Sequence, residues 1–302
     1  MQRFGGKVAD RPQGLSGLTW KVVIQAVMIT HPGHRSRALA ARLTALAAAG
    51  VAGGGLLVGC GGSAPTGAPR ATAASLAATA APASAKPGAR SAAALAKGSL
   101  AALRSGVSVH VDNVSVSQNG TADNSQDLTA KAGRAVMTAP SGARVTFLLV
   151  NGVAYLQGNA LGLTRFVGVS QAFAQRYAGR WIALQPRDQV GYASYDNITP
   201  ELTLSGEAGG LAMAAPEKLT GAATVAGQRV IGVSGPPPAS EQMPAGTRQV
   251  LYAADDPAMR PVRATLQGGS IKATTTFSRW GERVDVSAPP DSLPAATLPP
   301  ST

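Results

Sequence analysis

The stretch "RVTFLLVNGVAYLQG", Arg144–Gly158, decides the fold class of this chain of 302 residues. Two apolar runs flank Asn151-Gly152, a pair that readily takes the positive φ angles of a type I′ turn, so the stretch predicts a β-hairpin. Further hairpins are predicted over 223–235 about Ala226-Gly227, over 247–269 about 255–257, and over 270–289 about Trp280-Gly281. Successive hairpins with short turns are typical of one meandering antiparallel sheet.

Helical and strand patterns flank this hairpin. Upstream, residues 91–106 have leucines at near-helical spacing and end in glycine, which predicts a short helix. Apolar and polar residues then alternate over 107–111 and 114–117, which predicts one strand with a bulge or two short strands. Downstream, Thr199 and Pro200 predict the N-cap and the first residue of another short helix.

Residues 161–181 carry the strongest helical pattern. Its apolar residues recur at i, i+3, i+7 and i+11, and they are Phe166, Val169, Phe173 and Tyr177. Such a stripe must be buried, either as ordinary core packing against a sheet or as the wall of a ligand cavity. Together with the hairpins, these helices predict an α+β fold class, with one large curved antiparallel β-sheet and helices on one of its faces.

Cys60, the only cysteine, ends the string "LLVGC" after a basic segment (31–37) and an apolar segment (38–59). This order is that of a signal peptide, and the last four residues match the bacterial lipobox, in which the cysteine is acylated and becomes the new N-terminus. The alternative is a membrane-spanning helix with an incidental cysteine. The prediction is a lipoprotein signal peptide over 28–59, with Met28 as the true start and 1–27 as an extension before it.

The remaining chain divides into three predicted parts. Residues 60–90 are nearly all small or proline, a composition that cannot bury enough apolar surface to fold, so we expect a disordered tether. Residues 91–289 are expected to form one domain, and 290–302 a disordered tail. Residues 1–59 hold seven of the 27 basic and one of the 15 acidic residues, so their removal lowers the net charge from +12 to +6. The other cations are scattered, which argues against a nucleic-acid partner.

The sequence after Cys60 offers little for catalysis. His110 is its only histidine, and the alternating stretch around it favours a structural or solvent-facing histidine over a general base. Asp255-Asp256 precede a proline and are interpreted as turn residues rather than as glycosidase carboxylates. The sequence contains no nucleophile motif, phosphate-binding loop or cluster of metal ligands. The chain is therefore expected to be no enzyme and to need no metal or cofactor.

The C-terminal order "VAGQRVIGVSG", "LYAADDPAMRPVRATLQ" and "TTFSRWGERVDVSAP" resembles the LolA-like lipoprotein superfamily, in particular its actinobacterial LppX/LprG branch. The residues at the places of its motifs are Tyr252, Pro261, Val262, Arg263, Phe277, Ser278, Trp280, Gly281, Val284, Val286, Ala288 and Pro289. Arg283 replaces the usual proline. The resemblance spans 91–289 and implies a half-barrel sheet whose concave face is capped by helices around an apolar cavity for acyl chains.

What the resemblance implies, together with the lipobox, is a non-enzymatic lipoprotein anchored by Cys60 at the outer face of the plasma membrane. It is expected to be a monomer that binds or carries a lipid or glycolipid cargo, with an envelope transport protein as a further partner. The hairpin and helix surfaces should face each other, and the expected cavity lining is Leu148, Val150, Val153, Tyr155, Phe166, Val169, Phe173 and Tyr177. The alternative is an interaction or regulatory module of the cell envelope with a closed core and no cargo.

Overall fold

The structure is a computed structural model that describes residues 90–118, 120–238 and 243–301. The predicted extension, the signal peptide, Cys60 and the tether up to residue 89 lie outside the described residues. All described residues belong to one compact unit.

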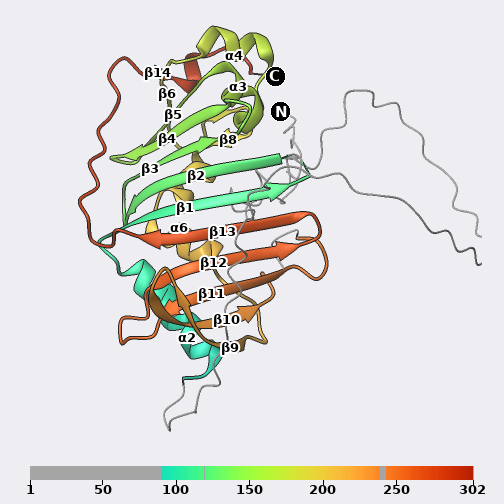
Figure 1. Ribbon diagram of the computed structural model, residues 1–302. Helices are drawn as coiled ribbons and strands as arrows, with labels where there is room; N and C mark the ends of the chain where they lie inside the picture. The colour runs from blue at the N-terminus through green and yellow to red at the C-terminus, as the bar shows by residue number, and fades with distance from the viewer. Residues whose placement is uncertain (1–89, 119, 239–242, 302) are drawn as a thin grey trace, which may run out of the picture. The chain divides into compact units, whose positions relative to one another are not determined.

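A single twelve-stranded sheet dominates this unit (Figure 1). Its order is β14-β6-β5-β4-β3-β2-β1-β13-β12-β11-β10-β9, so it is open, with β14 and β9 at its two ends. The strands are β1 (Ser108–Ser117), β2 (Gly120–Thr129), β3 (Gly133–Thr138), β4 (Arg144–Val150), β5 (Val153–Gly158), β6 (Ile182–Leu184), β9 (Lys218–Val225), β10 (Gln228–Gly235), β11 (Arg248–Ala254), β12 (Pro261–Gly268), β13 (Ile271–Ser278) and β14 (Leu293–Pro294). Neighbouring strands are antiparallel except β14 and β6, which are parallel.

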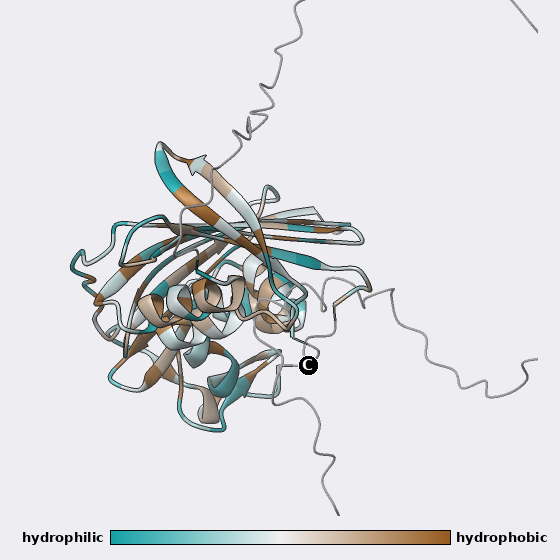
Figure 2. Cartoon of the chain, turned by 90° about the horizontal axis from the view of Figure 1, so that it is seen from below, coloured by the Kyte–Doolittle hydropathy of each residue, from teal (hydrophilic) through white to brown (hydrophobic). Residues whose placement is uncertain are grey.

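Short helices cover one face of this sheet, which we call the covered face (Figure 2). The helices are α2 (Ala92–Arg104), α3 (Ala160–Gly162), the π-helix η1 (Leu163–Val167), α4 (Gln171–Tyr177), α5 (Tyr195–Glu201), α6 (Leu204–Gly210) and the 3₁₀-helix η2 (Ala295–Thr297). A separate hairpin of β7 (Gln189–Val190) and β8 (Ala193–Ser194) precedes α5. The predicted α+β class, a large antiparallel sheet with helices on one face, is confirmed.

Several local predictions are confirmed by backbone geometry. Asn151 and Gly152 have φ angles of 51° and 76° between β4 and β5, as a type I′ turn requires. Ala226 and Gly227, with φ angles of 49° and 78°, join β9 to β10 in the same way. The first predicted helix is α2. The prediction of a bulged strand or two short strands after it is wrong, since β1 is one continuous strand with an unbroken register to β2 and β13.

The prediction of one long helix over 161–181 is wrong. The first part is α3 and η1, which end at Gly168 with a left-handed φ of 72°. The side chain of Ser170 then accepts a hydrogen bond from the Phe173 N–H and caps a new helix, α4. Glycine and serine therefore outweigh the apolar periodicity, because one ends a helix and the other begins one.

The next predicted helix begins earlier than expected. Ser194, not Thr199, caps α5 by accepting a hydrogen bond from the Asn197 N–H, and Pro200 lies inside the helix near its end. Thr203 immediately caps a further helix, α6, by accepting from the Gly206 N–H. The polar residues of this segment therefore produce two helices in place of one.

The last predicted hairpin, about Trp280-Gly281, is also wrong. β13 pairs with β12 through a turn at 269–270, and after Ser278 the chain forms no strand until β14. Residues 279–292 run along one side of the sheet, and β14 then adds to β6 (Figure 1). The expected disordered tail is instead part of the fold, since Ala295 is buried in the core and the Ser301 carbonyl accepts a hydrogen bond from the Ser170 N–H.

Candidate functional site

The predicted apolar stripe lies against the covered face at the β2–β6 end of the sheet. All four of its residues are buried in one core cluster, and the rings of Phe173 and Tyr177 lie 4.5 Å apart between centroids. The strand residues in the same cluster include Phe147 and Leu149 of β4 and Leu156 of β5. The helix stripe and the hairpin therefore do pack together, but through these strand residues.

The predicted hairpin residues of the cavity lie on the opposite face. Leu148, Val150 and Tyr155 form a separate buried cluster, against which Val153 and Trp181 are packed. Side chains alternate between the two faces of a strand, so Leu148 and Leu149 must point in opposite directions. The expectation that this set faces the helix stripe is wrong. The second half of β4, from Phe147 to Val150, is apolar on both faces, and only Arg144 and Thr146 at its start mark the face of Leu148 as the outer one.

A second apolar cluster occupies the other end of the covered face, under α2 and α6. Leu103 of α2 and Leu204 of α6 are fully buried there with Val111 of β1 and Phe277 of β13. The side-chain amide of Gln249 is buried beside them and donates a 2.8 Å hydrogen bond to the Leu211 carbonyl that follows α6. This half of the cover is therefore fixed by both apolar contacts and a satisfied polar group.

Polar side chains interrupt the apolar surface between these two clusters. A pocket of about 10 Å³, room for about one water molecule, lies between β2–β4 and α5. Asn124 and Gln126 of β2 and Glu201 of α5 line it together with apolar residues such as Phe147. Around this pocket the sheet and the helices are in contact, so any larger ligand here requires the helices to move away from the sheet.

A larger pocket opens at the β14 end of the sheet. It has a volume of about 500 Å³, within the range of small-molecule sites, and lies between α4, the β7–β8 turn and the C-terminal segment. Phe173 of the predicted cavity lines it, together with Val190 and Leu298. This pocket could not be predicted from the sequence, because six of its ten lining residues come from 295–301, a segment expected to be disordered.

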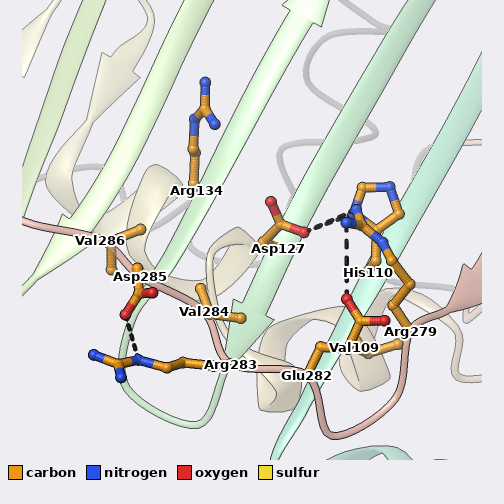
Figure 3. Close-up of a pocket in the computed structure, with 10 residues that line it drawn as sticks. All are labelled: Val109, His110, Asp127, Arg134, Arg279, Glu282, Arg283, Val284, Asp285 and Val286. Atoms are coloured by element: carbon orange, nitrogen blue, oxygen red, sulfur yellow. Dashed lines mark hydrogen bonds and ion pairs between the residues drawn. The ribbon is translucent and has the colours of Figure 1, made fainter.

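A charged cluster marks the outer face of the sheet, around His110 of β1 (Figure 3). Its imidazole Nδ1 lies 2.6 Å from Asp127 Oδ1 and its Nε2 lies 3.1 Å from Asp112 Oδ2. Arg279, directly after β13, contacts both His110 Nδ1 and the Asp127 carboxylate. His110, Asp127 and Arg279 line an open pocket of about 120 Å³. Glu282 lines it too, and its backbone carbonyl accepts a hydrogen bond from Ser108 Oγ.

Ser125, His110 and Asp127 lie next to one another in this cluster, in the order of a hydrolase catalytic triad. However, Ser125 Oγ is 3.5 Å from His110 Nε2, whereas the Asp112 carboxylate is only 3.1 Å from the same nitrogen. A general base needs a free lone pair facing its nucleophile, and here a carboxylate that can only accept a proton occupies that side. The geometry favours a structural ion cluster that holds the segment after β13 to the sheet.

Within 90–118, 120–238 and 243–301, no three His, Cys, Asp or Glu side chains are grouped so as to hold a metal ion. Among the helices of the same residues, none has the length and apolarity needed to cross a bilayer.

Comparisons with protein-family models and with curated proteins give no match. Among solved structures, the chain is similar to the lipoprotein LppX of Mycobacterium tuberculosis, with 19% identity and a TM-score of 0.43 over 65% of this chain and 98% of LppX. It is similar to LprF of Mycobacterium bovis, with 18% identity and a TM-score of 0.41 over 66% and 96% of the two chains. A LolA superfamily protein of Nitrosomonas europaea matches at 9% identity and a TM-score of 0.27 over 66% and 96%.

Proposed function

We propose that this chain is a non-enzymatic lipoprotein, anchored through Cys60 at the outer face of the plasma membrane, that binds or carries a lipid or lipoglycan. The observation that carries the proposal is the apolar covered face of an open sheet, which meets the surface at the 500 Å³ pocket beside Phe173. Acyl chains gain about 0.8 kcal/mol per buried methylene, so even partial entry between sheet and helices stabilises a complex.

The cover of this face is suited to opening. It consists of helices of 3 to 13 residues. One of them, η1, is a π-helix whose N-cap residue, Gly162, makes no side-chain hydrogen bond and which ends at the left-handed Gly168. Short helices are marginal by themselves and depend on packing. Acyl chains could therefore replace the sheet as the packing partner of η1 and α4 without breaking the strand hydrogen bonds.

A second candidate function is favoured by the packing itself. The stripe residues and the facing strand residues form one contiguous buried cluster, as in a closed core. A protein with such a core would act through its outer surfaces, as an interaction or regulatory module of the cell envelope. The charged outer-face cluster around His110 would then be a candidate contact surface.

Transfer between vesicles separates the two functions. The mature, acylated protein is inserted into donor vesicles that contain a self-quenched fluorescent phospholipid, and acceptor vesicles without the label are added. A carrier raises the rate of dequenching in proportion to the amount of protein. A rate equal to that of protein-free vesicles, at every protein density, favours the closed module.

A further inference from the structure

The most unusual part of the covered face is a row of polar side chains across its centre. Asn113 of β1 lies directly opposite Asn124 of β2 on one side and Thr275 of β13 on the other. Gln126 lies two residues after Asn124 on β2, so both side chains point to the same face of the sheet. We call Asn113, Asn124, Gln126 and Thr275 the polar row. It separates the two apolar clusters of the covered face.

One end of the polar row is satisfied and the other is not. Asn113 Nδ2 donates a 2.7 Å hydrogen bond to Thr275 Oγ1. By contrast, the side-chain oxygens of Asn124 and Gln126 are buried and have no hydrogen-bond partner among the described residues. Gln126 is only 2% exposed. Buried amide oxygens are nearly always paired in folded proteins, so two orphans side by side indicate a missing partner.

The space beside these oxygens limits what that partner can be. Both amides line the pocket of about 10 Å³, which also receives the buried carboxyl group of Glu201 from α5. With the helices in this position the pocket admits one oxygen or nitrogen atom, and a larger polar group such as a phosphate would require the helices to move further from the sheet. The apolar residues that line the pocket, such as Phe147 and Ile198, all belong to the cluster of Phe166, and the other apolar cluster lies beyond the polar row. Hydrocarbon would be buried favourably on these apolar surfaces.

A hydroxyl group fits these constraints best. The two unpaired atoms are both acceptors, so their partner must donate a hydrogen bond. A hydroxyl group donates one hydrogen and carries no charge into the apolar surroundings. Asn124 is only partly buried, so the polar row leads from the pocket towards the surface.

We infer that the pocket formed by Asn124, Gln126 and Glu201 binds a free hydroxyl group of the cargo, and that the protein selects lipids that carry one. The hydroxyl hydrogen is donated to the Gln126 or Asn124 side-chain oxygen, while the acyl chains lie along the apolar clusters on both sides. This inference rests on the proposed lipid-binding function and specifies the chemical class of the cargo.

The test uses matched lipids. The full chain is incubated with equal amounts of dioleoylglycerol, its acetate ester, and the amine analogue in which an ammonium group replaces the hydroxyl. The protein is repurified, and bound lipid is extracted and quantified by mass spectrometry. The wild type should retain the hydroxyl lipid about tenfold over the acetate, the effect of about one hydrogen bond to a buried group.

The decisive variant is Gln126→Leu, which removes the orphan oxygen but keeps a side chain of similar volume. It should bring the preference for the hydroxyl lipid close to one and leave the melting temperature unchanged or higher, because an unpaired buried oxygen is lost. The matched control is Gln249→Leu, which removes a buried glutamine whose amide is already paired with Leu211. This control should melt lower and keep the tenfold preference.

The outcomes distinguish the inference from the function on which it rests. Equal retention of hydroxyl and acetate lipids by the wild type, or a preference that survives Gln126→Leu, overturns the hydroxyl site while leaving a lipid carrier. Stronger retention of the amine analogue overturns the choice of hydroxyl over ammonium. If none of the three lipids is retained by wild type, the lipid-binding function itself fails.

Discussion

Gly133 of β3 and the carbonyl group of Leu202, which follows α5, meet with no side chain between them. A Cβ atom on Gly133 would overlap the Leu202 carbonyl oxygen and lie 3.0 Å from its carbonyl carbon. The next residue, Thr203, forms an isolated bridge with Thr129 at the end of β2. The absence of a side chain at Gly133 thus allows the α5–α6 junction to lie directly on the sheet.

Gly133→Ala should therefore push α5 and α6 away from the covered face. We expect the free energy of unfolding to fall by about 1–3 kcal/mol, as for other overpacked sites, and transfer of fluorescent phospholipid between vesicles to become faster. The control is Gly209→Ala in α6, where an added Cβ meets nothing within 4 Å. It should gain about 0.5–1 kcal/mol. A Gly133→Ala variant that melts and transfers lipid like wild type would show that this contact does not hold the cover closed.

The neighbours Leu148 and Leu149 test which face of β4 belongs to the site. Both are buried, and truncation of either to alanine should cost about 2–5 kcal/mol in unfolding free energy. Only Leu149 lies in the cluster with Phe166, so only Leu149→Ala should weaken lipid retention beyond what its lower stability explains. Retention is measured well below both melting temperatures. Equal loss in the two variants would contradict this assignment of faces.

Cys60 carries the predicted anchor, so Cys60→Ala should leave the precursor uncleaved and the domain without its lipid. Mass spectrometry of the protein recovered from membranes checks both points, since acylation adds the mass of the anchor at residue 60. The melting temperature of the domain should not change, because residue 60 is thirty residues before the described fold. Recovery of a cleaved, acylated Cys60→Ala protein would refute the lipobox interpretation.

His110→Ala tests whether the outer-face cluster is structural. The His110 side chain is only 12% exposed, but its partners Asp112 and Asp127 are 55% and 36% exposed, so water screens both ion pairs. Such pairs contribute little, so we expect a loss of about 1 kcal/mol in unfolding free energy and no change in lipid transfer. Hydrolysis of a lipid ester by the wild type that disappears in this variant would instead show that the chain is an enzyme.

The parts of the fold that depend on neighbouring residues alone, such as the tight turns, could be predicted from the sequence. Asn151-Gly152 and Ala226-Gly227 form the expected turns because their φ angles are encoded in two adjacent residues. The face of β4 was predicted wrongly, since the apolar run from Phe147 to Val150 hides the alternation of Arg144 and Thr146 with buried Val145 and Phe147 at the start of the strand. Which side meets the helices depends on long-range packing rather than on local pattern.

The site was predicted only in part for the same reason. The stripe of Phe166, Val169 and Phe173 is buried as expected, although Gly168 divides its helix. The role of Gln126 could not be predicted, because a glutamine within a polar stretch does not by itself indicate a buried site. Its burial depends on α5, which lies about seventy residues further along the chain. An aligned pattern of polar residues on neighbouring strands becomes visible only when the strand register is known.

Native mass spectrometry of the full chain extracted from bacterial membranes tests the central claim most directly. The account predicts species heavier than the acylated polypeptide by the mass of a lipid, released on adding organic solvent and reduced in Leu149→Ala but not in a control at an exposed position such as Val114→Ala. A spectrum that contains only the acylated polypeptide, in preparations that retain their membrane lipids until the final step, would contradict it.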